Sequence, residues 1–214
     1  MTNVFAPFGF AESHRLGAAP DYQMSRRWVN PANANPIYFG DPVSMVPTSG
    51  FIAQSAPGTF QVAGVFAGCQ YVSKAAKKII WSPWWPGTTG DVVTSGTGFD
   101  IEAKVLDDPL LAFRVQANGQ MTIAMIGNNA QFAFGLSTTP TGDTAHPPNQ
   151  MTGIGNACLD IINAAPAATA TFPFRIIDII RDPPGVNGTD ITTPYSWAFV
   201  AFNNQDYKAL TGHG

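Results

Sequence analysis

The clearest hydrophobic pattern in the chain is the strict alternation of apolar and polar residues from Phe99 to Leu106. A period of two places successive side chains on opposite faces, so this segment predicts a β-strand with one buried face. The turn-forming sequence Asp107-Asp108-Pro109 ends it, and alternation resumes in Leu110–Ala117. We therefore expect the two segments to be partner strands.

Other apolar segments also favour strands over helices. They are short, rich in Val, Ile, Phe and Tyr, and separated by Gly and Pro, and no long 3.6-residue period is present. The predicted strands are Ile37–Val46 with an interruption at Gly40-Asp41-Pro42, a long bent strand Thr59–Ser73, Leu159–Asn163, Thr171–Arg181 and Tyr195–Phe202. The segment Met121–Leu136 fits either a short helical turn or a strand pair. These patterns predict a mainly β fold, a β-sandwich or β-barrel with Gly/Pro-rich loops.

Residues 1–36 show no sustained period, yet they carry several aromatic side chains among prolines and small residues. A plain linker has few aromatics, so this segment predicts an extended N-terminal arm that packs onto something. Its target is either a neighbouring subunit or the arm's own domain, which we place at residues 37–214. The aromatic candidates for that contact are Phe5, Phe8, Phe10, Tyr22 and Trp28.

A tryptophan cluster lies in the sequence Trp81-Ser82-Pro83-Trp84-Trp85-Pro86-Gly87. Tryptophan combines a large apolar ring with one polar atom, and the two prolines stiffen the segment. Three interpretations remain open: a core corner that closes the end of a barrel, a protein–protein hot spot at a subunit interface, or a platform on which sugars stack. We include Trp81, Trp84 and Trp85 among the candidate interface residues.

Charge is scarce in this chain, since only 12% of residues are Asp, Glu, Lys or Arg, although 45% are hydrophobic. A surface so poor in charge indicates that a partner covers much of it; a polar secreted β-protein is the alternative. The net charge of −3 and the pI of about 5.4 argue against nucleic acid as a partner, because phosphate binding needs clustered cations. Two basic clusters are too small to change this expectation about nucleic acid: Lys74, Lys77 and Lys78, and Arg26 and Arg27.

The sequence predicts no metal, no cofactor and no membrane partner. Cys69 and Cys158 lie outside any zinc-ligand spacing, and their small apolar neighbours favour buried free thiols over a disulfide. The N-terminal sequence lacks the features of a signal peptide, and no apolar run is long enough to span a bilayer. We therefore expect synthesis and folding in a cytoplasm.

The chain offers no constellation that predicts catalysis. His14, His146 and His213 lie outside the predicted strands and have no carboxylate or second histidine at ligand spacing. No nucleophile elbow, phosphate-binding loop or dinucleotide fingerprint is present. Asp107-Asp108 is better explained as a turn than as a carboxylate pair. We predict a binding protein and not an enzyme, and a hydrolase would need a site that the sequence does not display.

An ordered set of short motifs spans nearly the whole chain: Phe8-Gly9-Phe10, Ile37–Val43, Gly64–Tyr71, Trp81–Gly87, Asp107-Asp108-Pro109, Phe174-Arg175-Ile176 and Phe202–Tyr207. This set resembles the head decoration, or cement, proteins of tailed double-stranded DNA bacteriophages. The resemblance implies a structural protein of the capsid exterior, made in the host cytoplasm, that clamps neighbouring major capsid subunits. It also implies self-association as a homotrimer, with a dimer as the alternative. The competing hypothesis is a carbohydrate-binding, lectin-like module that uses the Trp81–Trp85 cluster.

Overall fold

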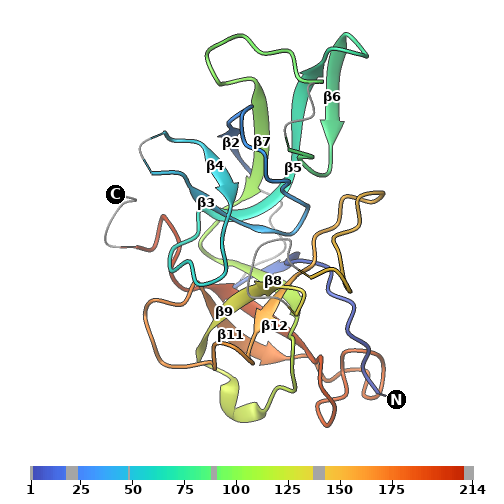
Figure 1. Ribbon diagram of the computed structural model, residues 1–214. Helices are drawn as coiled ribbons and strands as arrows, with labels where there is room; N and C mark the ends of the chain where they lie inside the picture. The colour runs from blue at the N-terminus through green and yellow to red at the C-terminus, as the bar shows by residue number, and fades with distance from the viewer. Residues whose placement is uncertain (1, 18–23, 48, 88–90, 137–142, 210–214) are drawn as a thin grey trace.

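A computed structural model describes residues 2–17, 24–47, 49–87, 91–136 and 143–209 of the chain. The described residues form strands and one short 3-10 helix, which confirms the predicted mainly β fold (Figure 1). The elements are β1 (Ala11–Arg15), β2 (Ser25–Val29), β3 (Pro42–Met45), β4 (Ile52–Gln54), β5 (Gly64–Ser73), β6 (Lys78–Ser82), β7 (Ile101–Leu106), β8 (Leu111–Gln116), η1 (Ile123–Met125), β9 (Asn129–Phe134), β10 (Ala157–Asp160), β11 (Phe174–Ile179) and β12 (Trp197–Phe202).

One half of the molecule is a five-stranded barrel, drawn at the top of Figure 1. Its strand order is β3-β4-β2-β7-β5, and a further pairing between β3 and β5 closes the ring. The strand β6 lies outside the ring and pairs with β5. The register of β5 shifts between Phe66 and Cys69, where Gly68 has a φ of 114°. This bulge bends β5, as the glycines of the predicted long strand indicated.

The other half is a second sheet with the order β1-β8-β12-β11-β9-β10. A single parallel bridge between Ala117 and Leu159 brings the end of β8 to the end of β10. The core beside this second sheet is dominated by phenylalanine. Phe10 stacks on Phe174 with 4.3 Å between ring centroids, and Phe174 stacks on Phe202 at 5.7 Å. The strand β1 pairs only with β8, so it extends this sheet as β6 extends the barrel.

The barrel and the second sheet share one hydrophobic core at their junction. Val62, Val65 and Leu106 come from the barrel side but pack in the same buried cluster as the phenylalanines of the second sheet. The buried side chain of Gln205 adds a polar link, since its Nε2 donates to the backbone oxygens of Ala63 at 3.1 Å and Asp107 at 3.2 Å. The two halves therefore form one body with a fixed relative orientation.

The N-terminal segment does not reach away from the molecule as the arm prediction proposed. Its described residues fold back onto their own chain, which is the alternative that the sequence left open. β1 joins the second sheet and β2 joins the barrel, where it pairs with β7 over five residues. The predicted boundary between an arm and a domain at residue 36 therefore separates β1 and β2 from the sheets to which they belong. Local periodicity could not reveal this, because both strands are short and their partners lie about 70 to 100 positions away.

Two other expectations need correction. The segments on either side of Asp107-Asp108-Pro109 are strands, but they are not partners: β7 belongs to the barrel and β8 to the second sheet. The short linker carries the chain from one half to the other instead of forming a hairpin. In addition, the segment Met121–Leu136 combines the helical turn η1 with a single strand, β9, which pairs with β10 and β11.

Candidate interaction surface

The structure divides the predicted interface aromatics between the interior and the surface. Phe10 and Trp85 have no exposed surface, and Phe5 is buried, so none of the three can meet a partner in this conformation. Phe8, Trp28 and Trp84 are half-buried, whereas Trp81 is 58% exposed. Tyr22 lies outside the described residues. The prediction for Phe5, Phe10 and Trp85 is therefore wrong, because the core of this chain already uses these rings.

The three buried or half-buried N-terminal phenylalanines anchor the first residues on the second half of the chain. Phe5 lies edge-on to His146 at 4.7 Å and Phe8 lies edge-on to Trp197 at 5.5 Å. The sequence reasoning missed Asn3, whose Nδ2 donates to the backbone oxygens of Asp190 and Pro194. Its partners are almost 190 positions away, so no local signal could have found it.

The tryptophan cluster is mainly a core corner, the first of the three interpretations. Trp85 packs edge-on against Tyr71 at 5.8 Å, and its Nε1 donates to the backbone oxygen of Asn33. Trp84 stacks on Tyr38 with an interplanar angle of 3°. Only Trp81, on β6, points outward. The corner therefore joins β6 to the segment before β3, and one ring of the three remains for an external partner.

The outer face of the barrel carries an in-register row of four side chains. Trp81 on β6 is opposite Gln70 on β5, Gln70 is opposite Glu102 on β7, and Glu102 is opposite Trp28 on β2. Directly paired residues of antiparallel strands share a face of the sheet, so the four side chains lie together outside the barrel. We call this set the Trp81–Trp28 row. Its ends are aromatic and its centre is polar.

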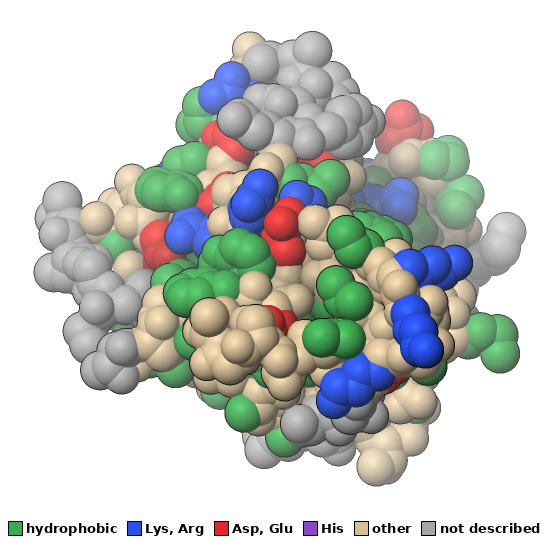
Figure 2. Space-filling model, turned by 90° about the horizontal axis from the view of Figure 1, so that it is seen from above, with side chains coloured by type: hydrophobic (Ala, Val, Ile, Leu, Met, Phe, Trp, Pro, Cys, Tyr) green, Lys and Arg blue, Asp and Glu red, His purple; other side chains and the backbone are tan. Residues whose placement is uncertain are grey.

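Charges around the row are balanced. Glu102 forms ion pairs with Lys104 and, at 3.3 Å, with Nε of Arg26. Burial raises the pKa of the Glu102 carboxyl, but Lys104, Gln70 and Arg26 outweigh burial and leave this pKa below its usual value. The carboxylate is therefore ionised at neutral pH and held in place. Seen from the barrel end, hydrophobic side chains are interspersed with both signs of charge (Figure 2).

Other titratable groups serve local structure. Asp143 accepts hydrogen bonds from the backbone of Leu136, Ala145 and His146 and from Nδ1 of His146 at 3.1 Å. Asp143 therefore ties the segment that follows it to the residue Leu136, just after β9. Asp107 and Asp108 point to different arginines, Arg27 at 3.1 Å and Arg15 at 2.8 Å, and they border a cavity of about 360 Å³ at the junction. This agrees with a turn and not with a shared carboxylate pair.

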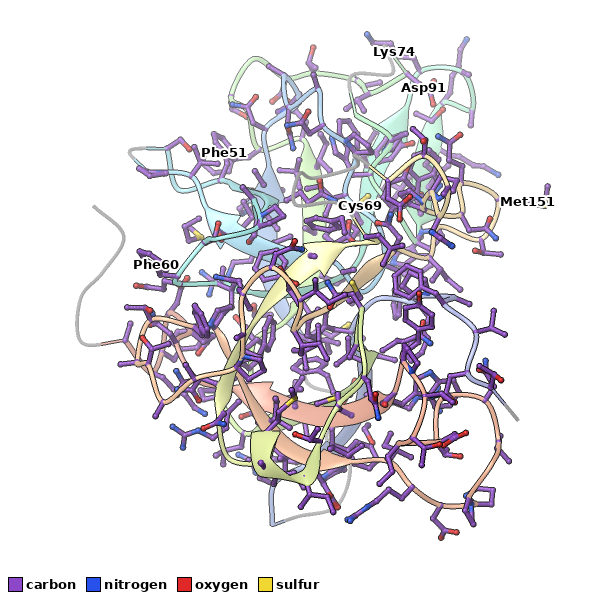
Figure 3. The ribbon with its side chains drawn as sticks, turned by 60° about the horizontal axis from the view of Figure 1, so that its bottom comes forward. Phe51, Phe60, Cys69, Lys74, Asp91 and Met151 are labelled. Carbon is purple, nitrogen blue, oxygen red and sulfur yellow. The ribbon has the colours of Figure 1, made fainter. Side chains whose placement is uncertain are left out.

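Both cysteines are buried free thiols, as predicted. Burial raises the pKa of Cys69 to about 12 and raises that of Cys158 further, so neither is a nucleophile at neutral pH. The basic residue Lys74 lies beside Asp91 at the end of the barrel, and the exposed Met151 projects from another loop (Figure 3).

No described residues form a group of three or more His, Cys, Asp or Glu side chains that could hold a metal ion. Within the same ranges, no helix has the length and apolar character needed to cross a bilayer. A scan against protein-family models, a search of curated proteins and a search of solved structures each found no match to this chain.

Proposed function

We propose that this protein is a structural, non-enzymatic virion protein that binds the outer surface of an icosahedral phage head. There it clamps neighbouring major capsid subunits and stabilises the shell. The proposal starts from the resemblance of its ordered motifs to head decoration proteins. Some motif residues distant in sequence contact each other: Phe10 stacks on Phe174, and Gln205 donates to the backbone oxygen of Asp107. These contacts join the two halves of the molecule into one stiff body.

The observation that carries the proposal is an open edge strand on each half of this body. β1 pairs only with β8 and β6 pairs only with β5, and no second strand of the described residues lies along either outer edge. An open edge accepts an extended segment of another chain through main-chain hydrogen bonds. A body that holds two such edges in a fixed arrangement is suited to joining two subunits.

The composition supports an exterior location on the shell. A pI of about 5.4 and a net charge of −3 suit a surface that faces away from packaged DNA. The exposed side chains include Ile79 at 67% and Trp81 at 58%, both on β6. Exposed apolar side chains favour association with another protein, and here they lie between Lys78 and Pro83, residues of the kinds that limit strand addition at the ends of β6.

The proposal includes self-association as a homotrimer, with a dimer as the alternative. Three copies around a local symmetry axis would multiply weak contacts through effective concentration. Sedimentation equilibrium of the purified chain, alone and mixed with empty heads, distinguishes a trimer from a dimer. A protein that stays monomeric in both conditions would contradict this part of the proposal.

The carbohydrate alternative retains one exposed ring of the Trp81–Trp85 cluster. Trp85 is inside the barrel and Trp84 is covered by Tyr38, so these two rings do not present a stacking surface. Of the original cluster, Trp81 alone keeps a ring that is more than half exposed and could meet a sugar.

Co-sedimentation with empty, expanded phage heads tests the clamp. We expect Ser13→Lys in β1 and Ile79→Lys in β6 each to reduce binding at least tenfold, because a lysine on an edge strand opposes strand addition. Ile123→Lys is the matched control, since Ile123 is 59% exposed on η1, away from both edges. Deleting residues 1–36 is a poorer test, because it removes β1 and β2 from the fold. Undiminished binding by both edge variants would overturn the proposal.

A further inference from the structure

The Trp81–Trp28 row has an architecture that a capsid clamp does not require. Its members come from four consecutive strands of the barrel sheet, β6, β5, β7 and β2. With neighbouring strands about 4.8 Å apart, the backbones of the two tryptophans stand roughly 14 Å from each other along the sheet. Between them lie one amide and one carboxylate.

The ring of Trp81 packs against the backbone of β5. A Cβ placed on Gly68 would stand 2.7 Å from Cζ2 of Trp81, so the ring lies directly over the glycine. The bulge at Gly68 and its φ of 114° create this space. The indole is thus supported by β5 at Gly68, while Trp81 remains 58% exposed.

A chain of aromatic rings fixes Trp28 at the opposite end. Trp28 lies edge-on to Phe99 with 5.6 Å between centroids, and Phe99 in turn contacts Phe51 at 5.4 Å. Edge-to-face contacts of this kind restrict ring rotation. Both ends of the row are therefore oriented before any ligand arrives, which lowers the entropic cost of binding.

A shallow cavity lies beside the centre of the row. Its volume is about 140 Å³, and it is lined by Trp28, Gln70, Val72, Ile79, Asp100 and Glu102. Asp100 Oδ1 accepts a hydrogen bond from the backbone of Ser95, while Oδ2 has no partner in the described part of the chain. Asp100 thus brings a second carboxyl group to the wall of this cavity, next to Glu102.

We propose that the Trp81–Trp28 row is a binding site for a neutral oligosaccharide. A sugar ring has apolar C–H faces and a rim of hydroxyl groups. The faces suit the two supported indoles, where burial of apolar surface favours contact. The hydroxyls donate to the carboxylates of Glu102 and Asp100 and exchange hydrogen bonds with the amide of Gln70. The ligand lies across the strands and spans both tryptophans.

The order of side chains distinguishes this ligand from a protein partner. Protein hot spots place aromatic side chains at a dry centre and polar ones at the rim, whereas this row has the reverse arrangement. The carboxylates of Glu102 and Asp100 oppose nucleic acid. The cavity is also smaller than the roughly 300 Å³ at which compact pockets for apolar small molecules begin. The site shares Ile79 and Trp81 on β6 with the capsid-binding proposal, but sugar binding needs no strand added to that edge.

The test is an array of neutral hexose oligosaccharides probed with the full chain. We expect binding to at least one glycan, and a loss of at least tenfold in Trp28→Ala and in Trp81→Ala. Trp28→Phe should retain part of the affinity, because a smaller ring still stacks. Gln70→Ala should weaken binding without abolishing it. Phe60→Ala is the matched control, since Phe60 is 59% exposed but belongs to a loop away from the row.

Far-UV circular dichroism must show that each variant is folded, and quenching or a shift of tryptophan fluorescence on titration gives a second readout. The proposal is overturned if no neutral glycan binds, or if Trp28→Ala binds as tightly as the native chain. It is also overturned if Trp28→Ala binds glycans as the native chain does but no longer co-sediments with empty heads. That outcome would assign the row to a protein interface.

Discussion

Gly9 and Gly40 lie backbone against backbone: a Cβ on Gly9 would stand 2.9 Å from Cα of Gly40, and a Cβ on Gly40 would stand 3.0 Å from Cα of Gly9. The contact also carries a hydrogen bond of 2.8 Å from the backbone N–H of Phe10 to the oxygen of Gly40. It brings the N-terminal segment to the start of β3, at the junction of the barrel and the second sheet.

Gly40→Ala should therefore destabilise the protein more than an ordinary glycine substitution. Gly40 has a φ of +87°, so the variant pays backbone strain of about 1–3 kcal/mol and adds a clash with the backbone of Gly9. Gly58→Ala is the control, because Gly58 has a φ of +89° with nothing within 4 Å of an added Cβ. Urea unfolding compares the two free energies. Equal losses would show that the Gly9 contact adds nothing.

Protonation of Asp41 should make stability depend on pH. The side chain is fully buried, with Oδ2 accepting hydrogen bonds from Tyr38 N–H and Gln54 Nε2, and burial raises its pKa from 3.8 to about 7. The unfolded chain loses this proton near pH 3.8, but the folded chain keeps it until about pH 7. Stability therefore falls as pH rises through this window, by a total on the order of 4 kcal/mol.

Asp41→Asn isolates this contribution, because asparagine resembles the protonated carboxyl and does not titrate. We expect the native chain and the variant to have similar unfolding free energies near pH 4, and the variant to be the more stable of the two above pH 7. Chemical unfolding at half-unit intervals from pH 4.5 to 7.5 measures the difference. A difference that stays constant across this range would show that Asp41 does not titrate there.

Trp85→Ala and Trp81→Ala should separate core from surface within one short segment. Trp85 is fully buried, so its truncation should cost about 3–5 kcal/mol. Trp81 is 58% exposed, so its truncation should cost less than about 1 kcal/mol. Thermal unfolding followed by near-UV circular dichroism measures both variants. Similar losses for the two would contradict the division of roles described above.

Cys69 and Cys158 should not react with an aromatic disulfide reagent in the native protein at pH 8. Both thiols are buried and have raised pKa values, so the thiolate fraction is small and access is blocked. In guanidinium chloride both should react, with two equivalents of thiol released. Cys69→Ala and Cys158→Ala show which of the two thiols gives each equivalent. Rapid reaction of native Cys158 would show that its neighbourhood opens readily.

The sequence was sufficient for the strand-rich character of the chain and for most strands of the second half. Alternation in Ile101–Leu106 and the apolar run Phe174–Ile179 correspond to β7 and β11. Pro173 directly precedes β11, as a proline at the start of a strand should. The strands β1, β2, β4 and β6 were not expected. Of these, β1 and β6 are edge strands and β4 has only three residues. Such strands do not show the alternation of buried apolar and exposed polar residues that gives a period of two.

The sequence also placed aromatic residues at the positions that matter, but it could not assign their directions. Trp81 and Trp85 are four positions apart, yet one lies on the outer face and the other inside the barrel. The Oγ of Ser82 accepts a hydrogen bond from the N–H of Trp84 and donates one to its backbone oxygen, and the chain bends between the two rings.

By itself, the sequence determined a mainly β chain with scarce charge, buried thiols and concentrated aromatics, because these properties depend on composition and local period. Only the tertiary structure decided that β7 and β8 belong to different sheets and that residues 1–36 complete both of them. It also aligned Trp81, Gln70, Glu102 and Trp28 in one row. Strand pairing joins residues that are tens of positions apart, and its register depends on bulges and shared core packing that no local pattern encodes.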